Sequence, residues 1–211
     1  MFDLLMVLIS LVGGFVLSLV LGKFLIPALR ALKAGQSIRE VGPKWHNGKS
    51  GTPTMGGLMF IAASLLCIAT GWRSMREGNY AHLLALALAL AFGMIGFADD
   101  FIKVKKKRNL GLTGLQKLVL QIIAAAAFLY FLYRHGALSC DLYLPFKAAP
   151  VTGIPKVVYL AFAVFVIVGC VNAVNLTDGI DGLASGVTMP VMLFFVLTSM
   201  LMKKMGLATF P

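Results

Sequence analysis

Residues 80–106 read YAHLLALALALAFGMIGFADDFIKVKK, an apolar run that ends in two aspartates and is followed by lysines. From Tyr80 to Ala98 the run contains no Asp, Glu, Lys or Arg. A helix needs roughly 20 apolar residues to cross the hydrocarbon core of a bilayer. A membrane-spanning β-strand would alternate polar and apolar residues, and this run does not. The stretch therefore predicts a transmembrane helix with acidic residues at one end.

The whole chain has the composition of an integral membrane protein. Its 211 residues are 59% hydrophobic and 13% charged, with a mean hydropathy of +0.90. Soluble domains average about 25% charged residues, so the composition disfavours a water-soluble domain. We predict an all-α polytopic membrane protein, with one domain over residues 1–211 and six transmembrane helices: Leu4–Gly22, Met55–Trp72, Tyr80–Ala98, Leu118–Tyr133, Val157–Val174 and Leu183–Met202.

The distribution of basic residues predicts the orientation of these helices. Segments 23–54 and 99–117 each hold six Lys or Arg, whereas 73–79 holds two and 134–156 holds three. Cytoplasmic loops carry the excess of Lys and Arg. The first two segments are therefore expected in the cytoplasm, with the N-terminus outside. By alternation, segment 175–182 is also expected on the cytoplasmic side.

The first of three unusual polar segments is KSGTPTMGG, residues 49–57, at the start of the second predicted helix. Small and hydroxyl residues at a helix start offer free backbone N–H groups and a positive dipole end, which suit phosphate. Lys49 adds a mobile cation. The alternative is an ordinary helix cap, with Thr52 or Thr54 as the N-cap residue.

The second is the aspartate pair that follows Ala98. Acidic residues at the end of a spanning helix are costly and usually functional, and a helix C-terminus disfavours anions. Adjacent helical residues point about 100° apart, so Asp99 and Asp100 are expected to face different surroundings. The alternative is that Lys103 and Lys105–Lys107 neutralise both acids in interfacial salt bridges, which are worth little.

The third is NAVNLTDGIDG, residues 172–182, which holds two amides and two carboxylates. Oxygen groups of this kind are ligands for a hard cation such as Mg²⁺. The alternative is a polar turn between two helices. Together, the three segments place a lysine, hydroxyls, acids and amides on the cytoplasmic side, which are the groups that phosphoryl transfer needs.

Several long motifs also occur in a consistent order along most of the chain: Gly35–Arg39, Gly42-Pro43, His46, Lys49–Gly57, Phe97–Phe101, Gly111–Lys117 and Asn172–Ala184. In these motifs the sequence closely resembles the phospho-N-acetylmuramoyl-pentapeptide transferases of the polyprenyl-phosphate N-acetylhexosamine-1-phosphate transferase superfamily. The resemblance implies a Mg²⁺-dependent enzyme of the bacterial inner membrane with its active site on the cytoplasmic face. Its substrates would be UDP-MurNAc-pentapeptide and undecaprenyl phosphate, and its products would be lipid I and UMP. The resemblance also suggests a homodimer.

The resemblance also implies roles for single residues. Asp99 and Asp100 match the family's catalytic aspartate pair, one of which would deprotonate or orient the lipid phosphate. Asn175 matches an amide that contacts the metal or the diphosphate. The implied substrate contacts are Lys49, Thr54, Lys103, Lys117, Asn172, Asp178, Asp181 and Gly182.

The main departure from the family is length, since its members have about ten spanning helices against six predicted here. A third aspartate, which is the main metal ligand, and a histidine-rich loop have no counterpart up to Pro211. We therefore expect the chain to be an N-terminal portion that is inactive alone.

Two alternatives stay open from the sequence. The first is a transferase of GlcNAc-1-phosphate for another envelope polymer. The second is a transporter component, although transporters place charges near the bilayer midplane rather than at helix ends. Nucleic-acid binding is not expected, because no aromatic residue for base stacking lies within Lys105–Arg108.

Overall fold

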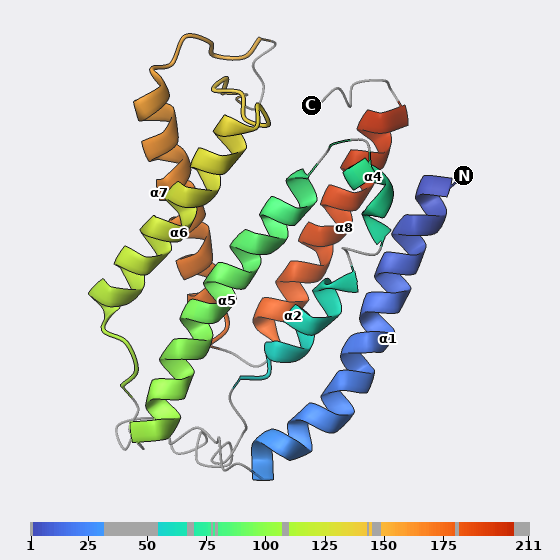
Figure 1. Ribbon diagram of the computed structural model, residues 1–211, viewed down its shortest axis with the longest axis vertical. Coiled ribbons are helices and arrows are strands. Elements are labelled where there is room, and N and C mark those ends of the chain that lie inside the picture. The colour runs from blue at the N-terminus through green and yellow to red at the C-terminus, as the bar shows by residue number, and fades with distance from the viewer. Residues whose placement is uncertain are drawn as a thin grey trace. The chain divides into compact units, whose positions relative to one another are not determined.

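The fold is all-helical in the part of the chain that the computed structural model describes, which is residues 2–31, 55–66, 70–76, 78, 80–106, 110–142, 144, 149–179 and 182–204. The described helices, drawn in Figure 1, are α1 (Phe2–Ala31), α2 (Leu58–Ser64), α4 (Trp72–Arg76), α5 (Ala81–Lys106), α6 (Gly114–Arg134), α7 (Lys156–Thr177) and α8 (Leu183–Lys204).

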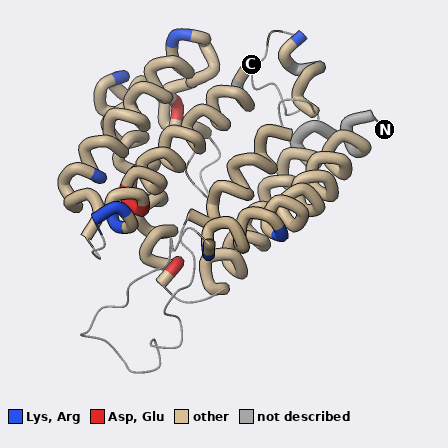
Figure 2. Tube along the Cα trace, turned by 60° about the horizontal axis from the view of Figure 1, so that its bottom comes forward, with Lys and Arg blue, Asp and Glu red and all other residues tan. Residues whose placement is uncertain are grey.

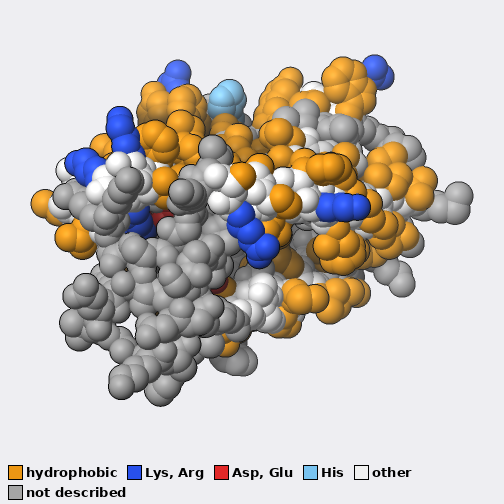
Figure 3. Space-filling view, turned by 90° about the horizontal axis from the view of Figure 1, so that it is seen from below, with side chains coloured by type: hydrophobic (Ala, Val, Ile, Leu, Met, Phe, Trp, Pro, Cys, Tyr) orange, Lys and Arg blue, Asp and Glu red, His pale blue; other side chains and the backbone are white. Residues whose placement is uncertain are grey.

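Five of these helices are long and apolar enough to cross a membrane. Their candidate spans are Leu5–Ala31, His82–Lys106, Gly114–Arg134, Lys156–Thr177 and Leu183–Leu201. Charged residues are sparse along the helices and gather toward their ends (Figure 2), and large apolar side chains reach the surface of the described part (Figure 3). In water such exposure would be costly, whereas lipid solvates apolar side chains. The prediction of an all-α polytopic membrane protein is confirmed.

Two predicted spans are shorter than the helices that contain them. We expected the third span to end near Ala98 and the fifth near Val174, whereas α5 continues to Lys106 and α7 to Thr177. Backbone hydrogen bonding does not depend on apolar side chains, so a helix continues into water beyond its membrane segment. In α5, Lys105 and Lys106 also favour the negative pole of the helix dipole.

The described residues of the predicted span Met55–Trp72 do not form one long helix that begins at Met55. A turn at Gly56 and Gly57 precedes α2, which is seven residues long, and residues 67–69 lie outside the described part. Gly57 is the N-cap of α2 and provides no side-chain hydrogen bond. The predicted cap residues Thr52 and Thr54 lie outside the described residues. A sixth membrane-spanning helix here stays a prediction.

The chain divides into two compact units, Met1–Ala124 and Ala125–Pro211. In the first unit, α2 packs on α1 and α5. Glycines allow the close approach: a Cβ atom added at Gly13 would lie 2.9 Å from Leu66, and one added at Gly93 would lie 2.8 Å from Ile61. Small residues at contacts of this kind let membrane helices pack closely.

The second unit contains the C-terminal half of α6 together with α7 and α8. Between α6 and α7, Leu142 and Val151 form an isolated antiparallel bridge with N–H···O distances of 3.1 and 2.9 Å. At the same end of α6, the Lys156 ammonium donates a 2.6 Å hydrogen bond to the Tyr133 hydroxyl and lies over its ring. These contacts join the end of α6 to the start of α7.

Candidate functional site

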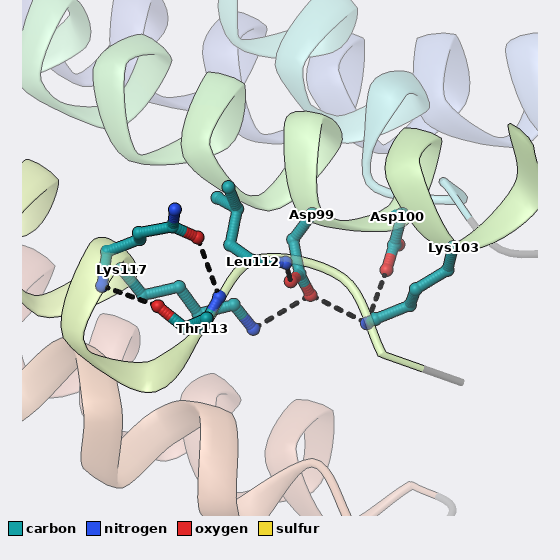
Figure 4. A network of polar contacts seen from close by, with 7 residues as sticks. Asp99, Asp100, Lys103, Leu112, Thr113 and Lys117 are labelled. Carbon is teal, nitrogen blue, oxygen red and sulfur yellow. Dashed lines mark hydrogen bonds and ion pairs between the residues drawn. The ribbon is translucent and has the colours of Figure 1, made fainter. Parts of the chain in front are cut away.

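A buried carboxylate near the C-terminal end of α5 is the centre of the candidate site. Asp99 is only 3% exposed. Its Oδ2 atom lies 2.6 Å from Nζ of Lys103, one turn later in α5, and 2.7 Å from Nζ of Lys117 in α6. A buried carboxylate is stable only when it is paired and hydrogen-bonded. Two ammonium groups from two helices provide that pairing (Figure 4).

The other oxygen of Asp99 is held by the backbone of the α5–α6 loop. The backbone N–H of Leu112 donates a 2.8 Å hydrogen bond to Oδ1. The preceding residue, Gly111, lies so close to Asp99 that an added Cβ atom would be 2.8 Å from its Cγ. Both carboxylate oxygens of Asp99 are therefore engaged within the first unit.

Asp100 lies in different surroundings from its neighbour. Its side chain is 30% exposed, and its one ion pair in the described part of the chain joins Oδ1 to Lys103 at 3.0 Å. The two aspartates differ in burial, in line with the expectation of different surroundings, although both carboxylates contact the same Lys103 ammonium. The bridge to Lys103 also bears out part of the salt-bridge alternative, but the acids are not equivalent. Asp99 is enclosed, whereas Asp100 is open to a ligand.

The helix dipole opposes the two aspartates less than we predicted. We placed the pair at the C-terminus of its helix, but Asp99 lies about two turns before Lys106, the last residue of α5. The dipole acts mainly within the last turn. Its unfavourable effect on Asp99 is therefore small, and the local lysines dominate.

The start of α6 brings Lys117 to the site. The backbone N–H of Thr113 donates to the Gln116 side-chain carbonyl at 2.9 Å, and the N–H of Gln116 donates to the Thr113 hydroxyl at 3.2 Å. This reciprocal pattern is a capping box. It fixes the first turn of α6, from which Lys117 reaches back to Asp99 (Figure 4).

The structure thus brings together four predicted site residues, which we call the lysine–aspartate cluster: Asp99, Asp100, Lys103 and Lys117. Gly111 and the Leu112 backbone were missed as site residues. A backbone N–H has no sequence signal of its own. The available signal was the motif Gly111–Lys117, which follows the acidic pair and begins with a glycine.

Other predicted site residues belong to the second unit, at the end of α7 and the turn before α8. The Asn172 amide donates to the Val168 carbonyl at 2.8 Å. Asn175 is exposed in α7, and Asp178 is the exposed C-cap residue. Gly182 has a φ of +79°, a conformation that favours glycine, and accepts a 2.8 Å hydrogen bond from the N–H of Gly186.

Three predicted site residues, Lys49, Thr54 and Asp181, lie outside the described residues. Within the described part of the chain, no three His, Cys, Asp or Glu residues gather around one point. In the first unit, Asp100 is the one cluster carboxylate with an oxygen not engaged by a described partner. Mg²⁺ prefers six oxygen ligands. The described residues of the first unit do not by themselves provide that many.

These features define a multi-pass membrane protein with paired lysines and acids at the end of a spanning helix. Residues 82–211 match the family model described as Glycosyl transferase family 4. The chain belongs to this family. Residues 49–61 match a second pattern, described as phospho-N-acetylmuramoyl-pentapeptide-transferase signature 1.

Relatives with the name phospho-N-acetylmuramoyl-pentapeptide-transferase occur in several bacteria. The protein of Thermoanaerobacter sp. (strain X514) is 44% identical over 206 residues, which cover 97% of this chain and 62% of the relative. The protein of Bacillus subtilis (strain 168) is 45% identical over 180 residues, which cover 85% of this chain and 55% of the relative. The chain thus matches about three fifths of the length of these relatives.

Proposed function

We propose that the protein transfers phospho-MurNAc-pentapeptide from UDP-MurNAc-pentapeptide to undecaprenyl phosphate and so forms lipid I and UMP. Membership of glycosyl transferase family 4, the match at residues 49–61 and the names of the relatives support this assignment. The observation that carries it is the convergence of Lys103 and Lys117 on one oxygen of Asp99, beside the more open Asp100.

The cluster offers what this reaction requires. An oxygen of the lipid phosphate attacks the β-phosphorus of the donor, a new P–O bond forms, and the bond to UMP breaks with its electron pair on UMP. Such a transfer depends on positioning and on neutralising phosphate charge more than on a strong base. Lys103 and Lys117 would supply positive charge to the diphosphate, and Asp100 would orient or deprotonate the lipid phosphate.

We include Mg²⁺ in the proposal, because a divalent cation neutralises diphosphate charge when it is bound. By the family resemblance, the exposed Asn175 would contribute an amide oxygen to the metal or the diphosphate. By the family resemblance, Lys49, Thr54, Asp181 and Gly182 would line the nucleoside pocket, and Asn172 and Asp178 would contact the substrate. We place the site on the cytoplasmic face of the bacterial inner membrane, with the N-terminus outside.

The test uses membranes that contain undecaprenyl phosphate. The chain is expressed alone and joined to the part of the Bacillus subtilis relative that extends beyond the match, with the intact relative as the positive control. We expect UMP release and a lipid-linked product from UDP-MurNAc-pentapeptide with the joined chain, and none with the 211 residues alone.

Two controls sharpen this test. Offering UDP-GlcNAc instead separates the muramoyl reaction from the GlcNAc-1-phosphate alternative, which would give product with that donor. Asp100→Asn in the joined chain is expected to stop turnover, whereas Lys105→Ala, at an exposed lysine on the same helix, is not. A folded joined chain that releases no UMP from either donor contradicts the proposal.

A further inference from the structure

The contact between the α5–α6 loop and Asp99 leaves no room for a side chain. A Cβ atom added at Gly111 would lie 2.5 Å from the carbonyl oxygen of Asp99 and closer still to its Oδ1. The φ of Gly111 lies outside the left-handed region, so backbone freedom is not the reason for glycine here. The reason is space, because the Gly111 backbone packs directly on the Asp99 carboxylate.

The next residue turns this close approach into a directed hydrogen bond. The Leu112 N–H reaches Oδ1 of Asp99 at 2.8 Å only because the chain at Gly111 passes against that carboxylate. This bond fixes the rotation of the carboxylate and directs Oδ2 toward the two lysines. Thr113 then begins the capping box that starts α6.

We propose that Gly111 and the Leu112 N–H are positioning groups for the cluster, and that Asp99 itself acts through the lysines it holds. This inference rests on the proposed function and adds residues to it. Asp99, fixed by the loop, gathers the ammonium groups of Lys103 and Lys117 at one oxygen. A free lysine side chain loses rotamer entropy when it binds an anion. Lysines already ordered by Asp99 are prepared for a phosphate.

The same geometry indicates different roles for the two aspartates. Asp99 has Oδ1 engaged by a backbone N–H and Oδ2 by two ammonium groups. Both oxygens of Asp99 therefore already have partners within the first unit. Asp100 has one ion pair and a side chain that is 30% exposed, so it is the aspartate that can touch substrate.

The test of this inference needs no substrate, so its result does not depend on whether the protein is active in the transfer assay. Lys103 and Lys117 are labelled with an amine-specific reagent in membranes that hold the full chain, and labelling rates are read by mass spectrometry. Exposed Lys105 is the internal reference. We expect Gly111→Ala to raise the labelling rate of Lys117 severalfold. Gly114→Ala is the matched control in the same segment, because a Cβ atom there meets nothing within 4 Å.

A double-mutant cycle shows whether Gly111 acts through Asp99. In an Asp99→Ala background Lys117 is already released, whereas Lys103 keeps its ion pair with Asp100, so Gly111→Ala should add no further labelling of Lys117. If Gly111→Ala does not fold, Asp99→Asn is used instead, because it keeps the shape of the side chain but loses its charge. Asp99→Asn should raise the labelling of Lys117 severalfold.

Three results would overturn the inference. One is unchanged lysine labelling in a folded Gly111→Ala chain, another is equal labelling in Gly111→Ala and Gly114→Ala, and the third is unchanged labelling in Asp99→Asn. If the lysines are released as expected but the joined chain transfers nothing, the positioning role stands and the proposed function fails. In an active joined chain, Gly111→Ala should lower kcat and Gly114→Ala should not.

Discussion

Lys117, in the first turn of α6, lies 2.7 Å from Asp99 of α5, so this ion pair joins the two helices on either side of the α5–α6 loop. The Leu112 N–H also donates to Asp99, and the Thr113–Gln116 capping box fixes the start of α6. Three separate interactions therefore position the described residues just before and within the first turn of α6.

Removing the Lys117 ammonium should destabilise the protein measurably. In Lys117→Ala, Asp99 keeps Lys103 and the Leu112 N–H but loses one charged partner, and we expect a loss of about 1–3 kcal/mol. Thermal unfolding in detergent checks this value. Lys105→Ala, at an exposed lysine, should leave the midpoint unchanged. Equal midpoints for the two variants would show that Lys117 does not stabilise Asp99.

Substitution of Asp99 should mainly lower stability, whereas substitution of Asp100 should mainly lower turnover. Asp99→Asn should lower the unfolding midpoint more than Asp100→Asn, because the buried Asp99 carboxylate is the partner of two ammonium groups. In the joined chain, Asp100→Asn should lower the transfer rate about 100-fold with little change in stability. Midpoints and UMP release are measured on the same preparations. The reverse order, with Asp100 the more important for stability, would contradict this division.

The capping box should set the stability of the start of α6. Thr113→Ala removes the hydroxyl that accepts the Gln116 N–H, and loss of an N-cap costs about 1 kcal/mol. Thr113→Ser keeps a hydroxyl and should restore most of the stability. Hydrogen exchange at the first turn of α6 should increase in the alanine variant alone. Similar exchange in both variants would mean that the box contributes nothing.

The packing of α2 on α5 depends on Gly93. A larger side chain there meets Ile61, so Gly93→Val should cost about 1–3 kcal/mol by overpacking. Gly96→Val is the matched control on the same helix, because a Cβ atom at Gly96 meets nothing within 4 Å. Thermal unfolding of both variants in detergent tests the contact. Loss of stability in Gly96→Val alone would contradict it.

The apolar pattern predicted most of the fold because bilayer thickness leaves few alternatives for a long uncharged run. It could not predict that α5 continues past Ala98, since the turns after the aspartates are held by backbone hydrogen bonds and by contacts with Lys103. It also could not predict that α2 is only seven residues long, from Leu58 to Ser64.

For the site, residue type was enough to find the acids and lysines but not their partners. The sequence indicated that Asp99 and Asp100 differ in direction, yet nothing in it distinguished the enclosed residue from the open one. That difference comes from the Gly111 and Leu112 backbone, whose position depends on how the α5–α6 loop folds. The relation of this cluster to Asn175 and Asp178 stays a prediction.

The bridging position of Lys103 between Asp99 and Asp100 has one more consequence. The two carboxylates and two ammonium groups of the cluster carry no net charge, so the cluster as a whole attracts a distant polyanion only weakly. Steering of a polyanionic molecule from a distance must then come from other cations, and exposed Lys106 in the last turn of α5 is suitably placed. Neutralising Lys106 should slow encounter and weaken its dependence on ionic strength, while the chemistry after docking is unaffected.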